Sequence, residues 1–394
     1  MQLSPNIADI FLLITTAQCF FLTVFILHKY GKPFANKILS AILFLYAAIF
    51  LNLFLWEMQA YADFPLFGLV LSGNAFFVPP LHYLYTLFLT RSSIKFKYQM
   101  LFHLVPFILY QTIIMFSFLM FSDFFSGKEA IISGGETPFF ALIINWAITL
   151  QGIAYSILSI RLISNYSKKI KNLFSSIDKI KLGWLRNITI MYSAALVVFF
   201  IEVSLVSSNY EISGQFDFSS LIAAVYVYII GYMGIFKSEI FSNPAFTNQI
   251  DNFSLEDIES EPQTKKYSKS GLSPEKANEY LEKLLKMVED EKIYCDSELT
   301  LGKLSAKIDI SAHNLSEIIN TKLNQNFFDF VNYYRVEKVK KDLADTHKKN
   351  LTLLAIALEA GFNSKSAFNL IFKKQTGLTP SEYKNQISLS SVIS

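Results

Sequence analysis

Two short stretches near the C-terminus, one after Ser311 and one after Ser364, carry small polar and basic side chains at the start of an expected helix. Such side chains bind the edges of nucleic-acid bases, since Asn forms two hydrogen bonds with adenine and Lys reaches guanine. The candidates for base contact are His313, Asn314, Ser316, Asn320, Lys365, Ser366 and Asn369, with Ser311 and Ser364 beside them. Any single one could instead lie on a solvated helix face, but the whole set favours contact with DNA.

Basic residues further along the same stretches have a different expected role. Lys322, Lys373 and Lys374 are read as contacts to phosphates, which position a protein on a duplex without specifying its sequence. The whole segment 292–394 is basic, with 14 Lys or Arg against 10 Asp or Glu. This charge balance suits a nucleic-acid partner.

A repeated pattern of short amphipathic helices must position these side chains. The first unit predicts a helix at Leu301–Ile308, a turn at Asp309, which tolerates left-handed geometry, and a second helix at Ala312–Leu323. The second unit repeats the pattern with helices at Leu353–Ala360 and Lys365–Gln375. Each unit therefore reads as a helix-turn-helix.

A longer helix, about Phe327–Asp345, is expected between the two units. At 1.5 Å per residue it measures about 28 Å. Successive major grooves on one DNA face are about 34 Å apart, so a rigid connector of this length lets both units read one duplex.

Residues 299–384 resemble the DNA-binding domain of the AraC/XylS family of transcriptional activators. The residues that carry the resemblance are Ile356-Ala357-Leu358-Glu359-Ala360-Gly361-Phe362, Ser366, Phe368, Phe372-Lys373-Lys374, Gly377 and Thr379-Pro380-Ser381-Glu382-Tyr383. The stretch Phe327–Arg335 is similar to that family's connecting helix. The resemblance implies an all-α double helix-turn-helix domain that binds promoter DNA and contacts RNA polymerase.

Five positions depart from the family pattern. Asp309 and Asn324 replace common glycines, and Ser305 replaces a common alanine. Ala367 stands where an aromatic residue is frequent, and Leu370 where Arg is frequent. The missing basic residue at 370 weakens the expectation of a base or phosphate contact from that point.

The first 237 residues have the composition of a membrane domain. A helix needs about 20 mostly apolar residues to cross the hydrocarbon core of a bilayer. Over the whole chain, 52% of residues are hydrophobic and only 17% are charged. We count seven apolar runs: Ile7–Leu27, Ile38–Leu55, Leu66–Leu89, Met100–Phe121, Phe139–Ile160, Asn187–Ser207 and Phe218–Phe236.

The charges in the gaps between these runs predict an orientation. Thirteen basic residues fall in alternate gaps and one in the others. Basic residues concentrate in cytoplasmic loops, so we expect a multi-pass protein of the bacterial cytoplasmic membrane, with its N-terminus outside and its C-terminal domain in the cytoplasm. The first run could alternatively be a cleaved signal peptide, but its positive charges follow the apolar stretch rather than precede it.

Three polar residues inside the runs are candidates for sensing a ligand: Glu202, His82 and Asn74. Polar groups in membrane spans often mark functional sites, but hydrogen bonding between helices is the alternative reading. The spans carry no HExxH motif, paired Asp motif or His cluster. We therefore expect no catalytic residue, no metal site and no cofactor, and no enzyme activity.

Two segments have open readings. The Lys-rich loop 164–183 has apolar residues at helical spacing, so it predicts either an amphipathic helix on the inner leaflet or an extension of the flanking spans. The segment 238–272 is predicted to be a flexible linker. It is followed by a helix at 273–292, which either packs on the next domain or forms a homodimer seam.

The expected architecture is all-α, with a seven-helix transmembrane sensor at 1–237, a linker at 238–272, a connecting helix at 273–292 and a double helix-turn-helix domain at 293–394. The leading hypothesis is a membrane-anchored one-component transcription regulator, an activator by resemblance, whose partners are promoter DNA, the lipid bilayer and an unidentified stimulus. The alternatives are a transporter or membrane enzyme with a helix-turn-helix docking module, and helix-turn-helix units that bind only protein.

Overall fold

The computed structural model describes residues 7–31, 33–58, 60, 68, 70–71, 73–91, 94, 96–120, 138–207, 218–241 and 272–393. Over these residues the fold is all-α, which confirms the predicted class; the only β-type pairing that they show is an isolated bridge between Phe174 and Thr300. The described residues divide into two compact units. One draws on 1–165 and 182–247, and the other on 166–181 and 248–394.

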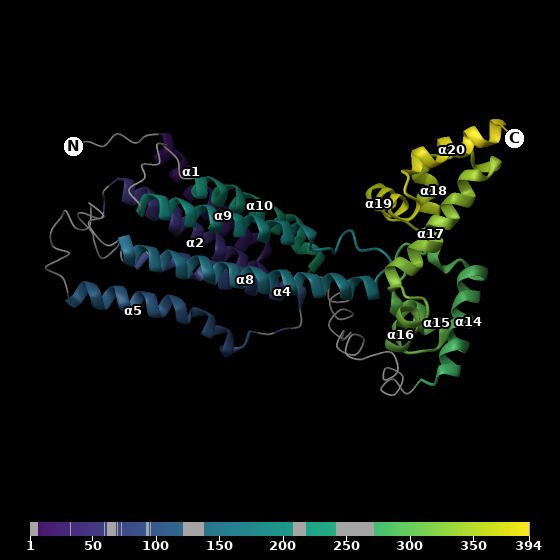
Figure 1. Cartoon of the computed structure of the whole chain (residues 1–394), viewed down its shortest axis with the longest axis horizontal. Helices are drawn as coiled ribbons and strands as arrows, with labels where there is room; N and C mark the ends of the chain where they lie inside the picture. Colours follow the sequence, from purple (N-terminus) through teal and green to yellow (C-terminus); the bar gives the residue numbers. More distant parts are fainter. Residues whose placement is uncertain are drawn as a thin grey trace. The chain divides into compact units, whose positions relative to one another are not determined.

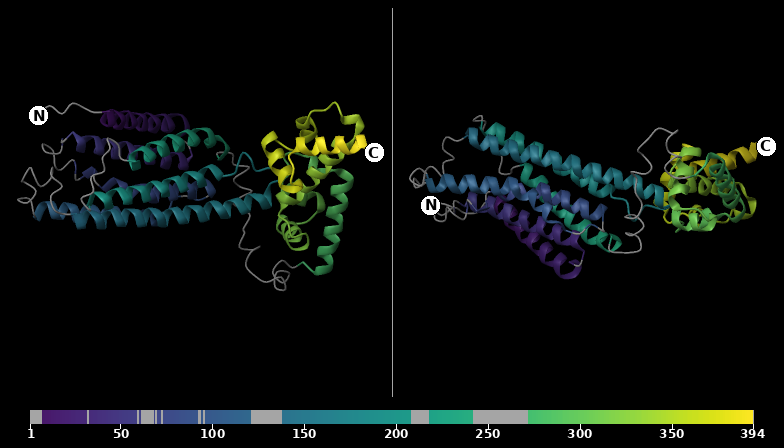
Figure 2. Two further views of the ribbon diagram at one scale, coloured as in Figure 1. Left: turned by 45° about the horizontal axis from the view of Figure 1, so that its top comes forward. Right: turned by 90° about the horizontal axis from the view of Figure 1, so that it is seen from below.

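The first unit is built from long apolar helices (Figure 1). Its α-helices are α1 (Ile7–Tyr30), α2 (Phe34–Glu57), α4 (Val78–Thr90), α5 (Val105–Met120), α8 (Pro138–Leu173), α9 (Gly183–Ser207) and α10 (Phe218–Phe241). Two 3-10 segments, η2 (Gly73–Phe77) and η3 (Tyr98–Leu104), precede α4 and α5. Helix α1 packs along α2, and α9 along α10 (Figure 2).

Six helices among the described residues are long and apolar enough to cross a membrane. Their ranges are Ile7–Tyr30, Phe34–Glu57, Tyr98–Phe116, Leu142–Leu173, Gly183–Leu205 and Phe218–Phe236. The difference from the seven predicted runs lies in the third. There α4 has only 13 residues, because Pro79 and Pro80 fall in its first turn, where the missing N–H of proline is tolerated and where helices therefore begin.

The second unit contains the predicted helix-turn-helix elements. Its helices are α14 (Pro274–Glu291), α15 (Leu301–Ile308), α16 (Ala312–Lys322), α17 (Phe327–Ala344), α18 (Leu353–Glu359), α19 (Lys365–Thr376) and α20 (Pro380–Ile393), with 3-10 turns η4 (Ile293–Cys295) and η5 (Thr346–Lys348). Side-chain caps explain where they begin: Ser311 accepts from the Asn314 N–H at 3.1 Å, and Ser364 from the Ala367 N–H at 3.1 Å. Helix α17 joins the first helix-turn-helix to the second, as the sequence predicts.

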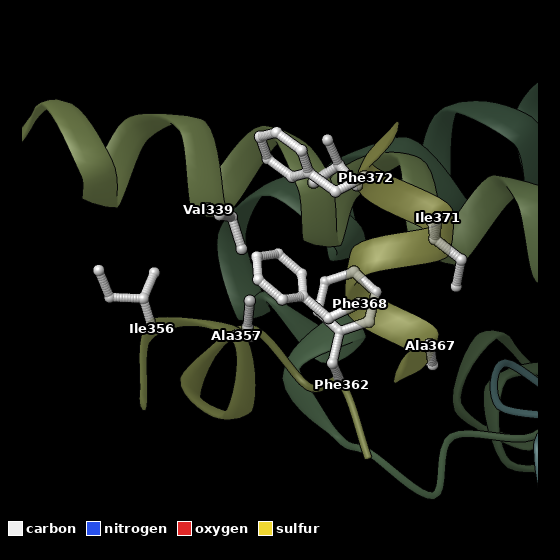
Figure 3. Close-up of a cluster of buried hydrophobic side chains, with 10 residues drawn as sticks. Val339, Ile356, Ala357, Phe362, Ala367, Phe368, Ile371 and Phe372 are labelled. Carbon is white, nitrogen blue, oxygen red and sulfur yellow. The ribbon is translucent and has the colours of Figure 1, made fainter. Parts of the chain in front are cut away.

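The second helix-turn-helix has its own apolar core (Figure 3). Phe362 in the turn and Phe368 and Phe372 on α19 pack with buried residues of α17 and α18, and each is at most 2% exposed. The Phe362 and Phe368 rings have centroids 5.3 Å apart, and the Phe368 and Phe372 rings 5.6 Å apart. Because one face of α19 is buried here, its opposite face must point to solvent.

Helix α14 uses its apolar face within the chain. Ala277, Leu284 and Val288 are buried, and Ala277 packs with Ile318 of α16. These contacts are packing on the domain that follows the helix. Most of the predicted linker, residues 242–271, lies outside the described residues, while residues 238–241 complete α10.

The turn of the first helix-turn-helix has the left-handed geometry that the sequence predicts. Asp309 has φ 60° and ψ 51°. Asn324, which also replaces a common glycine, has φ 52°. Asp and Asn are among the few residues besides glycine that adopt this conformation at a modest energetic cost.

Substitution at Asp309 should therefore follow backbone preference. We expect Asp309→Gly to keep or raise the stability of the second unit by up to about 1 kcal/mol, and Asp309→Val to lower it by about 1–2 kcal/mol. Thermal unfolding of the full chain in detergent measures both. The same pair of substitutions at Asn324 is the matched case, and equal melting of the Gly and Val variants would contradict the argument.

Candidate nucleic-acid interface

The outer face of α19 carries the predicted contact residues of the second helix-turn-helix. Lys365, Ser366, Asn369, Lys373 and Lys374 are all exposed. They alternate with the buried residues of the core at helical spacing. The helix therefore presents a mainly polar and basic surface, which is suited to a DNA groove.

Two features of this face were not expected from the sequence. Lys374 forms an ion pair with Asp329 of α17, with Nζ and Oδ1 3.1 Å apart, so it is tied to the connecting helix. Leu370 is 66% exposed at the centre of the face. A basic residue is frequent at this position in the family. An exposed Leu there could instead make apolar contact with a thymine methyl group.

The matching face of α16 is largely covered. The helices start 53 residues apart, at Ser311 and Ser364, so Ser316 corresponds to Asn369 and Glu317 to Leu370. Yet Ser316 is 1% exposed and Glu317 is 5% exposed, whereas Asn369 and Leu370 are open to solvent. The two helix-turn-helix motifs therefore present unequal surfaces to solvent.

The remaining predicted residues of α16 are partly accessible. His313, Asn314 and Asn320 are half-buried, while Ser311 and Lys322 are exposed. The Asn320 amide donates to the backbone carbonyl of Ser316 at 2.8 Å, so in this conformation it is engaged within its own helix.

Glu317 is a residue that sequence reasoning missed. In the part of the chain that the structure describes, both of its carboxylate oxygens are buried without a hydrogen-bond partner. Burial of a carboxylate without partners is unfavourable. A residue-by-residue alignment of the two helix-turn-helix units would have identified position 317, because it matches the exposed position 370.

Arg335 on α17 is the most buried charged residue of the second unit, at 1% exposed. Its Nε donates to the Tyr294 carbonyl at 2.8 Å, Nη1 to the Ser175 carbonyl at 3.1 Å, and Nη2 to the Asp296 carbonyl at 2.8 Å. Burial lowers the pKa of Arg335 to about 10, so the side chain remains charged at neutral pH. The guanidinium thus ties α17 to two other chain segments, one at Ser175 and one at Tyr294–Asp296, through their carbonyls.

A network of side-chain ion pairs holds the C-terminal end of α17. Asp342 lies 2.6 Å from Lys338 and 3.1 Å from Lys348, and Lys348 also pairs with Glu359 of α18 at 2.8 Å. Burial raises the pKa of Asp342, but hydrogen bonds from the two lysines outweigh this and lower it overall. The hydrogen bond with Glu359 raises the pKa of Lys348 to about 12. Helix α18 is thereby oriented relative to α17.

The three candidates for sensing lie in the first unit and are separate from this interface in sequence. His82 is 1% exposed, and its Nδ1 and Nε2 lie 2.9 Å from the Tyr226 hydroxyl and the Thr189 hydroxyl. It therefore links α4, α10 and α9. Glu202 on α9 accepts hydrogen bonds from the backbone N–H of Ser219 at the start of α10, at 3.2 Å to each oxygen, and Asn74 is half-buried in η2.

No cluster of three or more His, Cys, Asp or Glu side chains that could hold a metal ion occurs among the residues described.

The Arg335 site predicts a large loss of stability on truncation. Arg335→Met should lower the free energy of unfolding of the second unit by at least about 2 kcal/mol, because several buried carbonyl oxygens lose their donor and each such loss costs about 1–3 kcal/mol. Chemical denaturation of the full chain in detergent provides the measurement. Lys341→Met, on the exposed side of the same helix, is the control and should change stability little. Equal stability of the two variants would contradict the role given to Arg335.

Comparison with known proteins identifies the second unit. A family described as "Helix-turn-helix domain" matches residues 304–386, which form a helix-turn-helix domain of the AraC/XylS type. The match includes α16 and α19 and the connecting helix α17.

Several named relatives are transcriptional regulators. An uncharacterised HTH-type transcriptional regulator of Staphylococcus aureus strain COL is 30% identical over 123 residues, which are 31% of this chain and 15% of that protein. The uncharacterised HTH-type transcriptional regulator YtdP of Bacillus subtilis strain 168 is 30% identical over 91 residues, or 23% of this chain and 11% of that protein. The chain thus spans only about 15% of the length of the first of these relatives.

Among solved structures, a protein of unknown function from Listeria innocua matches with 27% identity and a TM-score of 0.24. The match covers 27% of this chain and 94% of that one.

Proposed function

We propose that this chain is a membrane-anchored one-component transcription regulator, which binds promoter DNA through its helix-turn-helix units under the control of its N-terminal helices. The observation that carries the proposal is the exposed face of α19. Its polar and basic side chains stand on a capped helix with a rigid apolar core, within a domain of the AraC/XylS type.

The chemistry of this face supports DNA as the partner. Asn369 offers both a donor and an acceptor, which matches the major-groove edge of adenine. Lys365 at the start of the helix and Lys373 two turns later provide positive charge for phosphates. Helix α19 has the more exposed face in this conformation, and α16 would join it in binding DNA once its covered face is exposed.

The first unit supports a membrane anchor. Its helices expose many large apolar side chains, among them Ile14 at 61%, Phe21 at 65%, Leu119 at 68% and Leu150 at 60%. Such a surface is unfavourable in water and suits lipid. With the basic loops inside, the anchor holds the helix-turn-helix domain in the cytoplasm of a bacterial cell, where it meets DNA and RNA polymerase.

Sensing would act through the packing of the anchor helices. The His82 hydrogen bonds join α4, α9 and α10, and the Glu202 contact joins α9 to α10. A stimulus that favours one arrangement of these helices over another changes the population of the two states. Pairing of two tethered domains into a homodimer is a second way in which such a change would reach DNA.

Binding to DNA should depend steeply on salt. The full chain in lipid nanodiscs should bind a labelled duplex of about 40 base pairs, long enough for two successive major grooves. Lys365→Ala and Lys373→Ala should each weaken binding and reduce the slope of log affinity against log salt by about 1. Fluorescence anisotropy from low to moderate salt measures this.

The control is Lys286→Ala, an exposed lysine on α14, which should leave the slope unchanged. Equal slopes for all of these chains, or binding that does not respond to salt, would contradict contact through α19.

The orientation is tested by reporters at the C-terminus. A reporter that is active only in the cytoplasm should be active when fused there, and one that is active only outside the membrane should be silent, because the basic loops resist translocation. Enzyme assays on cells that carry each fusion give the measurement. Activity of the external reporter would exclude the proposed regulator, since its DNA-binding domain would never meet a chromosome.

A further inference from the structure

The loop between α8 and α9 belongs structurally to the DNA-binding unit. Residues 166–181 group with 248–394 rather than with the rest of the first unit. Helix α8 continues to Leu173, and the apolar residues that a helix on the inner leaflet would turn towards lipid, such as Ile170 and Phe174, are buried in the protein. The Tyr166 hydroxyl donates to the Ile180 carbonyl at 3.0 Å, which folds the loop back on α8. We call residues 174–181 the strap.

The strap is anchored to the start of the helix-turn-helix domain. Phe174 pairs with Thr300 in the isolated antiparallel bridge. The Ser175 N–H donates to the Leu299 carbonyl at 3.2 Å, and the Ser175 hydroxyl donates to the same carbonyl at 2.7 Å. Leu299 and Thr300, the partners of the strap here, are the two residues directly before α15.

The same serine completes the buried site around Arg335. Its carbonyl accepts from Arg335 Nη1 at 3.1 Å and from the Asn332 amide at 3.0 Å, and its hydroxyl accepts from Arg335 Nη2 at 3.0 Å. Ser175 is 1% exposed. The strap therefore supplies hydrogen-bond acceptors for Asn332 and Arg335 of α17, the helix that connects the two helix-turn-helix motifs.

The far end of the strap lies at the start of the recognition helix α19. Asp178 Oδ2 accepts a hydrogen bond from the Ser364 hydroxyl at 3.0 Å, and Asp178 Oδ1 pairs with Lys181 at 2.9 Å. Ser364 is the N-cap of α19, and its hydroxyl lies 3.2 Å from that of Ser366, a candidate for base contact. A carboxylate thus occupies the positive end of the helix that is proposed to enter DNA.

We propose that the strap is autoinhibitory: Asp178 blocks the start of α19, and DNA binding requires the strap to leave it. A DNA phosphate and the Asp178 carboxylate carry like charge and compete for the same helix end. Because the strap follows α8 directly in the chain, a displacement of α8 moves it. The inference rests on the proposed function, since it concerns access to the proposed DNA surface.

The covered face of α16 is in keeping with a closed state. Ser316 and the unpartnered carboxylate of Glu317 are buried there, while their counterparts on α19 are exposed.

Charge removal at Asp178 tests the proposal. In the full chain in nanodiscs, Asp178→Ala and Asp178→Asn should bind a mixed-sequence duplex about 5- to 10-fold more tightly than the unmodified chain, within the range of ordinary coupling between sites. Asp290→Ala removes an exposed acid on α14 and should leave affinity unchanged. Unchanged or weaker binding by both Asp178 variants would overturn the proposal, because the strap would then be neutral or supportive.

Hydrogen exchange provides a second readout on the unmodified chain. Addition of the duplex should speed exchange of the Ile180 and Lys181 amides, which donate to the Ile177 carbonyl at the Asp178 end of the strap, and slower or unchanged exchange there would overturn the proposal. Equal DNA binding by the unmodified chain and the Asp178 variants removes only the strap inference. Absence of DNA binding by all of them removes the proposed function and the inference together.

Discussion

The guanidinium of Arg335 is the interaction on which the second unit depends. Among the residues that the structure describes it has no carboxylate within ion-pair distance, and it is stabilised by carbonyls from positions 175, 294 and 296. Isolated buried charges are costly, so all these acceptors must be in place at once. Because Arg335 lies in the middle of α17, this requirement fixes the connecting helix relative to the chain that precedes both helix-turn-helix units. The spacing of the two recognition helices follows from that helix.

The two recognition helices are built by one local design but have different surroundings. Each begins at a serine cap and buries an aliphatic or aromatic stripe. Beyond its core side, α19 is contacted by the strap at its N-cap, where Ser364 donates to Asp178, whereas α14 packs on α16 through Ala277 and Ile318. The same sequence repeat thus yields one open and one largely covered surface. The difference comes from neighbouring segments and not from the repeat itself.

Much of the fold could be predicted because its signals are local. The caps at Ser311 and Ser364, the left-handed turn at Asp309 and the apolar stripes all act within a few residues, so the helices lie where the sequence places them. The strap could not be predicted. Its contacts join Ser175 to Arg335 and Asp178 to Ser364, residues 160 and 186 positions apart, and nothing near either residue indicates the pairing. The partners of His82 are likewise 144 and 107 residues away.

The strap has contacts of unequal strength, and this decides how it would respond to DNA. At its start Ser175 makes two buried hydrogen bonds with the charged Arg335 side chain, each worth about 1.5–3 kcal/mol. At its far end Asp178 is joined to Ser364 by one partly buried bond, and its pairing with the exposed Lys181 is worth at most about 1 kcal/mol. A phosphate that approaches α19 therefore needs to displace only the weaker end. The anchor at Ser175 remains in place, so α8 keeps its link to the helix-turn-helix domain while the proposed DNA-binding surface opens.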